Sequence, residues 1–171
     1  MDNLHAQPAV KLAPPPRMTR TGSDFLYIFH AMATPCEVRL ESEDAALAQA
    51  VAHAVETEAR RIEQRFSRYK ADSVVGRINA SGGQELLVDA ETAHLLDFAR
   101  NCFEISDGLF DITSGVLRRI WRFDGSDNIP SDAQIKQMRA LVGWEKVSWQ
   151  SPAIRLPPGM EIDLGGLGKE Y

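Results

Sequence analysis

The sequence lacks most of the signals that assign a chain to a functional class at once. It has two cysteines, Cys36 and Cys102, and no CxxC pair, so neither a zinc site nor a disulfide framework is implied. We expect both cysteines to be buried free thiols. The four histidines are scattered along the chain, and no HExxH or Ser/His/Asp arrangement can be read. The common signatures of metalloproteases and serine hydrolases are therefore missing.

The chain also lacks a basic charge excess, an export signal and a long apolar run. Its formal net charge is −5, whereas nucleic-acid-binding domains normally present a basic face. Residues 1–20 contain no apolar segment typical of a signal peptide, and no window of about 18 apolar residues would span a membrane. We therefore expect a cytoplasmic protein that binds no nucleic acid. A non-native N-terminus would leave a periplasmic location open.

What is present fits one globular domain of 171 residues, 44% of them hydrophobic. Residues 1–22 resemble a disordered, proline-containing tail, and residues 23–171 form the predicted domain. Residues 24–33 and 36–42 read as two strands, with a break at Thr34 and Pro35. A long helix is predicted over residues 44–68, with Ser42 as its N-cap.

This long helix has an apolar face and a charged face. The residues expected to face the core recur at helical spacing: Leu47, Val51, Val55, Ile62 and Phe66. The charged residues read as a solvated face: Glu56, Arg60, Arg61, Glu63 and Arg65.

The rest of the chain interleaves short strands and helices irregularly. We expect a short helical turn before Asn79, a strand at 85–89, a helix over 89–106 capped by Asp89, and a helix over 131–142 capped by Ser131. The helix over 89–106 should bury six residues: Leu95, Leu96, Phe98, Ala99, Cys102 and Phe103. A hairpin at 146–156 and a last strand at 160–164 complete an α+β fold with a mixed sheet. Residues 115–123 fit either a helix or an extended segment.

The C-terminal stretch IDLGGLGKEY combines an acid, three glycines and a lysine. Glycines allow a ligand to approach the backbone, exposed amides can bind anions, and Lys169 can add a positive charge for a phosphate. The spacing matches neither the P-loop nor GxGxxG. From the residues alone, Asp163 and Lys169 mark either a nucleotide-binding turn or a structural corner with a surface lysine.

Two further residues have two readings each. Asp111 lies between Phe110 and Ile112, so its carboxylate needs a partner, which is either a ligand or the backbone that follows it. Tyr69 follows the long helix and either stacks on a flat ring or covers the core. Met32 reads as an ordinary core residue.

Taken in order, five segments resemble a known family. They are HAMATPCEVRL, RFSRYKADSVVGRIN, DGLFDITSGVLRRIWRF, IPSDAQIKQMRALVGWEKV and MEIDLGGLGKEY. They are similar to the ApbE family of FAD:protein FMN transferases, which shows MGT, LSxYxxxSxLxxxN, GxFDIT and DLGGxxKGY segments. No single motif is specific, but their order and intervals match from about residue 25 to residue 171. In this sequence Ala33 stands where the family commonly has glycine, and Glu170 where it commonly has the glycine of KGY.

The resemblance implies an activity and a set of site residues. Such enzymes use Mg²⁺ to cleave FAD, transfer FMN to a threonine of an acceptor flavoprotein and release AMP. The resemblance carries FAD contacts onto the following residues of this chain: Met32, Tyr69, Leu109, Phe110, Asp111, Asp163 and Lys169. It carries a Mg²⁺ ligand onto the carbonyl of Gly166, and it favours the ligand role for Asp111.

Family members are about twice as long as this chain. The resemblance therefore implies that the catalytic residues, and an Asp and a Thr that complete the metal site, lie in a C-terminal half beyond residue 171, and that the chain alone is inactive. Two other functions stay open at this point. One is an FAD-binding protein that transfers nothing, and the other is a Mg²⁺-dependent FAD pyrophosphatase.

Overall fold

The computed structural model describes residues 14–121, 129–169 and 171. The chain divides into two compact units, residues 1–61 and residues 62–171. None of the helices in the described parts is both long and apolar enough to cross a bilayer.

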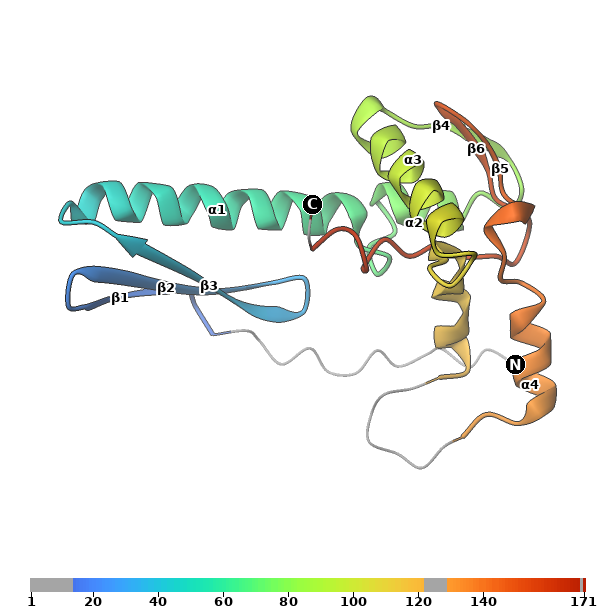
Figure 1. Ribbon diagram of the computed structural model, residues 1–171, viewed down its shortest axis with the longest axis horizontal. Coiled ribbons are helices and arrows are strands. Elements are labelled where there is room, and N and C mark those ends of the chain that lie inside the picture. The colour runs from blue at the N-terminus through green and yellow to red at the C-terminus, as the bar shows by residue number, and fades with distance from the viewer. Residues whose placement is uncertain (1–13, 122–128, 170) are drawn as a thin grey trace. The chain divides into compact units, whose positions relative to one another are not determined.

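The first unit is built on an antiparallel meander of three strands (Figure 1). The strands are β1 (Arg17–Thr21), β2 (Asp24–Ala31) and β3 (Thr34–Glu41), with β2 in the middle. Alternate residues of β2 are buried, as expected for a strand with one face on the core: Phe25, Tyr27, Phe29 and Ala31. The predicted tail is wrong in part, because β1 lies within it and pairs along its whole length with β2.

The turn between β2 and β3 lies earlier than predicted. Thr34 and Pro35 belong to β3 and pair with Ala31 and His30 of β2, so they do not break the strand. The two-residue loop is instead Met32 and Ala33, with φ of 52° and 58°. Hairpin loops of two residues favour positive φ at both positions, since that backbone twist matches the twist of the strands. Sequence reasoning missed this turn because neither residue is Gly or Asn.

Helix α1 (Ala45–Phe66) begins at a different cap from the predicted one. Asp44 Oδ1 accepts hydrogen bonds from the backbone N–H groups of Ala46 and Leu47, at 2.9 and 3.1 Å. Ser42 lies two residues before the cap, where its Oγ accepts from the N–H of Asp44 at 3.0 Å and helps to fix the capping residue. An aspartate at this position also places negative charge at the positive end of the helix dipole.

The face of α1 that is buried in the first unit is also not the predicted one. The exposed fractions of Leu47, Val51 and Val55 are 56%, 39% and 41%. The buried positions are Ala48, Ala52 and Glu56, one residue further along each turn. Small side chains let the helix lie close to the large aromatic residues of β2, which explains why the bulkier apolar residues are left outside. Ile62 and Phe66, at the C-terminal end of α1 and in the second unit, are buried as predicted.

Glu56 is therefore a buried charge rather than part of a solvated face. Its carboxylate accepts hydrogen bonds from the Tyr27 hydroxyl and from Arg60 Nε, the latter at 2.8 Å. Burial raises the pKa of the Glu56 carboxyl, but the hydrogen bonds from Tyr27 and Arg60 outweigh burial and hold it below its ordinary value. The same contact, with burial, raises the pKa of the Tyr27 hydroxyl.

The second unit contains short helices and a small sheet. After α1 come α2 (Val74–Asn79), β4 (Glu85–Leu87), α3 (Ala90–Ile105) and the 3-10 helix η1 (Ile112–Arg119). They are followed by α4 (Asp132–Arg139), the 3-10 turn η2 (Trp144–Lys146), β5 (Ser148–Gln150) and β6 (Ala153–Arg155). The sheet is antiparallel in the order β4-β6-β5. The predicted helix caps Asp89 and Ser131 and the hairpin are confirmed.

Helix α3 buries most of its predicted face. Leu95, Leu96 and Ala99 are buried, whereas Phe98 is 55% exposed, so its predicted burial is wrong. Cys102, like Cys36, is a half-buried free thiol. Trp149 of β5 donates a 2.8 Å hydrogen bond from its indole Nε1 to Asp97, which ties the hairpin to α3.

The predicted last strand is not a strand. Residues 160–164 join no ladder within the described parts of the chain, although Met160, Ile162 and Leu164 are buried. The Asn79 side chain takes the place of a neighbouring strand, since its Oδ1 accepts from Ile162 N at 2.8 Å and its Nδ2 donates to Ile162 O at 3.0 Å. The Asp163 N–H donates to the carbonyl of Ile112 at 2.8 Å. These contacts satisfy the buried backbone without a sheet.

Candidate functional site

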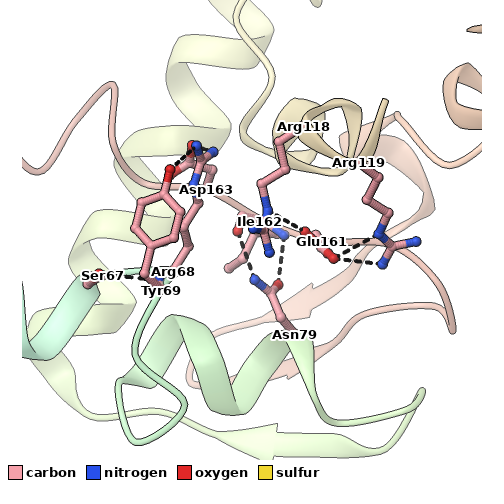
Figure 2. A network of polar contacts seen from close by, with 9 residues as sticks. All are labelled: Ser67, Arg68, Tyr69, Asn79, Arg118, Arg119, Glu161, Ile162 and Asp163. Carbon is pink, nitrogen blue, oxygen red and sulfur yellow. Dashed lines mark hydrogen bonds and ion pairs between the residues drawn. The ribbon is translucent and has the colours of Figure 1, made fainter. Parts of the chain in front are cut away.

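Three segments that are far apart in the sequence meet in the second unit. They are the loop after α1 (residues 67–73), the start of η1 (residues 109–113) and the glycine turn with the residues before it (residues 161–168). Figure 2 shows the polar contacts that join the first and third of these segments. The hydrogen bond from Asp163 N to Ile112 O joins the second and third. Gly115 is required here, because a Cβ on it would lie 2.9 Å from the Cβ of Asp163.

Tyr69 presents its ring on the surface of this junction. Its side chain is 67% exposed, so the alternative that it covers the core is wrong. The guanidinium carbons of Arg68 and Arg118 lie 4.9 and 5.8 Å from the centre of the ring. Arg68 Nη2 also donates to the Tyr69 hydroxyl at 2.7 Å. An exposed aromatic ring held in this way is a suitable platform for a flat ring of a ligand.

Arg68 also contacts the glycine turn. Its Nη1 forms an ion pair with Asp163 Oδ2 (Figure 2), and the two side chains are 22% and 27% exposed. The other oxygen of Asp163 accepts from the N–H of Gly165 at 2.9 Å. Asp163 therefore fixes the first bend of the glycine turn and, through Arg68, links it to Tyr69.

A second pair of arginines extends the network. Glu161, which is 12% exposed, accepts from Arg118 Nε at 3.0 Å and from Arg119 Nε at 2.9 Å (Figure 2). Two cations therefore share one carboxylate next to Tyr69. The local charge is positive, which suits an anionic ligand such as a nucleotide.

In the structure, Asp111 has the capping role. Its Oδ1 accepts from the backbone N–H and the hydroxyl of Thr113, at 2.8 and 2.7 Å, and its Oδ2 accepts from Trp144 N at 3.0 Å. Thr113 Oγ1 in turn accepts from Gly143 N at 2.7 Å. The acid of the FDIT motif thus joins η1 to the segment that follows α4. A contact between Asp111 and FAD stays a prediction.

The other predicted residues of the second unit lie at the surface of the same region. The Phe110 ring packs against the glycine turn, since a Cβ on Gly166 would lie 3.4 Å from it. Leu109 is 92% exposed, and Lys169 is exposed on the turn. Phe110 and Gly166 are therefore neighbours. The FAD contacts of Leu109, Phe110 and Lys169 stay predictions, and so does the Mg²⁺ ligand role of the Gly166 carbonyl.

The described residues do not form a complete metal site. A carbonyl oxygen such as that of Gly166 is a ligand type that Mg²⁺ accepts. Among residues 14–121, 129–169 and 171, however, no group of three or more His, Cys, Asp or Glu side chains is placed to hold an ion. Asp163 is engaged with Arg68 and Gly165, so it offers no unshared carboxylate.

Met32 belongs to the first unit, where it is half-buried against the core formed by Tyr27, Phe29, Ala31 and Ala52. This position agrees with its reading as a core residue, and its contact with FAD stays a prediction. Sequence reasoning missed Arg68, Arg118 and Asn79 as parts of the site. The signal for Arg68 was its position directly before Tyr69 in a loop, and Asn79 is the last residue of the LSxYxxxSxLxxxN segment.

The comparisons with known proteins agree with this arrangement. The model of the ApbE family matches residues 32–171, and the chain belongs to that family. The FAD:protein FMN transferase of Klebsiella pneumoniae is 30% identical over 146 residues, which are 82% of this chain and 45% of that protein. The protein of the same name from Escherichia coli K12 is 31% identical over 123 residues, or 64% of this chain and 34% of that protein.

Solved structures show the same fold. The ApbE protein of Thermotoga maritima superposes with a TM-score of 0.77 and 29% identity, over 86% of this chain and 49% of that one. The flavin transferase ApbE of Vibrio cholerae gives a TM-score of 0.73 at 20% identity, over 91% of this chain and 50% of that one, which supports the fold alone. The chain thus spans about half the length of the solved structures and less than half that of the curated relatives it matches.

Proposed function

We propose that this chain is part of an FAD:protein FMN transferase that moves FMN from FAD to a threonine of an acceptor flavoprotein and releases AMP. The observation that carries the proposal is the meeting of three family segments in the second unit. Arg68 links Tyr69 to the glycine turn, and Phe110 packs on Gly166 of that turn. Relatives with this name match the chain over up to 82% of its length.

The chain's own residues supply binding and positioning in this proposal. The exposed ring of Tyr69 stacks on one of the flat rings of FAD. The amides of the glycine turn and the ammonium group of Lys169 face the phosphates, where positive charge stabilises the anion. The Phe110 ring packs on Gly166 and supports the same turn. Such a transfer requires mainly that the reacting groups are held in line and that the charge on the phosphates is stabilised.

In the transfer, the threonine oxygen of the acceptor forms a bond to the phosphorus of the FMN half. The bond from that phosphorus to the oxygen bridging the two phosphates breaks, the hydroxyl proton is lost to a base, and AMP leaves. Mg²⁺, when bound, would neutralise the pyrophosphate and favour departure of AMP. The Gly166 carbonyl is the ligand that this chain offers, and we propose that the remaining ligands come from residues outside the described parts.

The test is the intact mass of an acceptor protein. The full-length protein is incubated with FAD, Mg²⁺ and a flavoprotein domain that carries a threonine acceptor site. We expect the acceptor to gain the mass of one FMN, one AMP to appear per adduct, and both products to disappear with EDTA or when the acceptor threonine is replaced by Val. AMP and free FMN without an adduct would refute the transferase and indicate a pyrophosphatase. FAD that is bound and recovered unchanged would indicate a flavin-binding protein.

A matched pair of lysine variants tests the glycine turn. Lys169→Gln should weaken FAD binding by about five- to tenfold, since one charge-assisted contact to a phosphate is lost. Lys136→Gln removes an exposed lysine of α4 to which no FAD contact is assigned, and it should leave the affinity unchanged. Equal affinities for Lys169→Gln and the wild type would contradict a phosphate site at this turn.

A further inference from the structure

Arg68 contacts both the Tyr69 platform and Asp163 of the glycine turn. Its Nη2 donates to the Tyr69 hydroxyl at 2.7 Å, and its Nη1 pairs with Asp163. Its guanidinium carbon also lies 4.9 Å from the centre of the Tyr69 ring. One planar side chain therefore makes three contacts to two segments that are 94 positions apart, from Tyr69 to Asp163.

We propose that Arg68 is a positioning residue of the flavin-nucleotide site, which fixes the Tyr69 ring and the glycine turn in one arrangement. This inference rests on the proposed function. Arg68 acts through Tyr69 and Asp163, since its two terminal nitrogens are already engaged by them. It holds the ring and the anion-binding turn in a fixed arrangement relative to each other.

The chemistry of the contact requires arginine. The guanidinium presents donors in a rigid fork, so separate N–H groups can serve the tyrosine hydroxyl and the carboxylate at the same time. A lysine would bring a single nitrogen on a flexible stem, and it could hold Asp163 or Tyr69 but not both in this geometry. The partial burial of Arg68 and Asp163 reduces solvent screening of their ion pair.

Without Arg68, both segments lose a restraint. Tyr69 is 67% exposed, and its ring would keep the nearby guanidinium of Arg118. Asp163 would keep its contact with Gly165 but would carry a half-buried carboxylate without a counter-ion. A ligand would then have to order the ring and the turn as it binds, which weakens its affinity. The chemical step itself should change little.

The first measurement is the affinity and turnover of four variants of the full-length protein. Arg68→Gln should raise both the Kd and the KM for FAD about tenfold and lower kcat less than about threefold, as expected for lost preorganisation. Arg68→Lys and Tyr69→Phe should each raise Kd about threefold, because each removes the contact to the hydroxyl and keeps the charge or the ring. In the double variant these two effects should not add, since both remove the same contact.

Arg155→Gln is the matched control. Arg155 is an exposed arginine of β6 whose pairing with Glu85 spans 3.7 Å, so its loss should change neither Kd nor the melting temperature. A purely structural role of Arg68 would lower the melting temperature and leave the Kd of the remaining folded protein unchanged. That result would overturn the inference, and so would additive effects in the double variant.

The second measurement does not depend on flavin. Hydrogen exchange of the ligand-free protein should become about tenfold faster in both residues 67–72 and residues 163–168 of Arg68→Gln, because both segments lose a restraint. Faster exchange confined to residues 67–72 would overturn the link between the segments. A wild-type protein that binds FAD but transfers no FMN would instead refute the proposed function, and the affinities of the Arg68 variants would still decide the inference.

Discussion

Replacing Asn79 with Ala tests how the segment before the glycine turn is held. The amide of Asn79 makes two hydrogen bonds, of 2.8 and 3.0 Å, to the N–H and C=O of Ile162. Ile162 is 0% exposed, so water cannot replace the lost partner without opening the structure. A buried polar group left without a partner costs about 1–3 kcal/mol, and two such groups with partial relaxation suggest a loss of about 2–4 kcal/mol.

The assay is urea unfolding of the full-length protein at neutral pH, with the free energy of unfolding taken from the midpoint and slope. Asn79→Asp separates the two bonds, because its carboxylate accepts from the Ile162 N–H but cannot donate to the Ile162 carbonyl. If the contact to the Ile162 N–H dominates, Asn79→Asp should therefore lower the free energy of unfolding less than Asn79→Ala does. Asn101→Ala removes an exposed asparagine of α3 and should change stability by no more than about 0.5 kcal/mol.

A loss below about 0.5 kcal/mol for Asn79→Ala would refute this reasoning. It would mean that the backbone of Ile162 finds other partners, and that the Asn79 amide does not stand in for a strand. A reduced slope of the unfolding curve without a change of midpoint would point instead to a less compact native state.

Three further predictions concern the turn in the first unit, its buried carboxylate and the threonine network. Ala33→Gly should stabilise the protein by about 0.5–1 kcal/mol in urea unfolding, because glycine adopts the positive φ of 58° without strain; a loss of stability would contradict the turn. Because the pKa of Glu56 is lowered, its carboxylate stabilises the folded protein fully above the ordinary value of 4.5, and this stabilisation is lost as the pH falls through the folded-state pKa. Because the pKa of Tyr27 is raised, its hydroxyl stabilises the folded protein fully below 10.0, and this stabilisation is lost as the pH rises through the folded-state pKa. In a pH series, Glu56→Gln should remove the fall of the melting temperature at acid pH. A variant that shows the same fall as the wild type would indicate that other groups cause it. Thr113→Val should cost about 1–3 kcal/mol, because the N–H of Gly143 loses its acceptor, while Thr113→Ser should retain most of the stability; equal losses would show that the methyl group matters rather than the hydroxyl.

Local signals in the sequence were sufficient for the starts of α3 and α4 and for the hairpin. Asp89 and Ser131 cap helices because their side chains reach the N–H groups two or three positions on, which is a property of a few neighbouring residues. The face of α1 was predicted wrongly for a non-local reason. The aromatic residues of β2 require small partners, so Ala48 and Ala52 are buried instead of Leu47 and Val51.

The candidate site was predictable as a set of motifs but not as a geometry. Sequence order identified Tyr69, Phe110 and the glycine turn, and the structure places their segments together in one unit. Arg68 could not be assigned from sequence, since its two partners are one and 95 positions away. The oxygens of Asp111 accept from Thr113 and Trp144, a role that depends on residues up to 33 positions away, and its contact with FAD stays a prediction.

The buried position of Thr113 bears on self-modification. In the proposed reaction a threonine hydroxyl is the acceptor, and Thr113 belongs to the segment that begins with Phe110. Its side chain is 0% exposed, its hydroxyl donates to Asp111 and its oxygen accepts from Gly143. Because the side chain is buried, an incoming phosphorus atom cannot reach the hydroxyl without local opening of the structure. In the proposed transferase, this burial would keep the threonine of the FDIT motif from being modified.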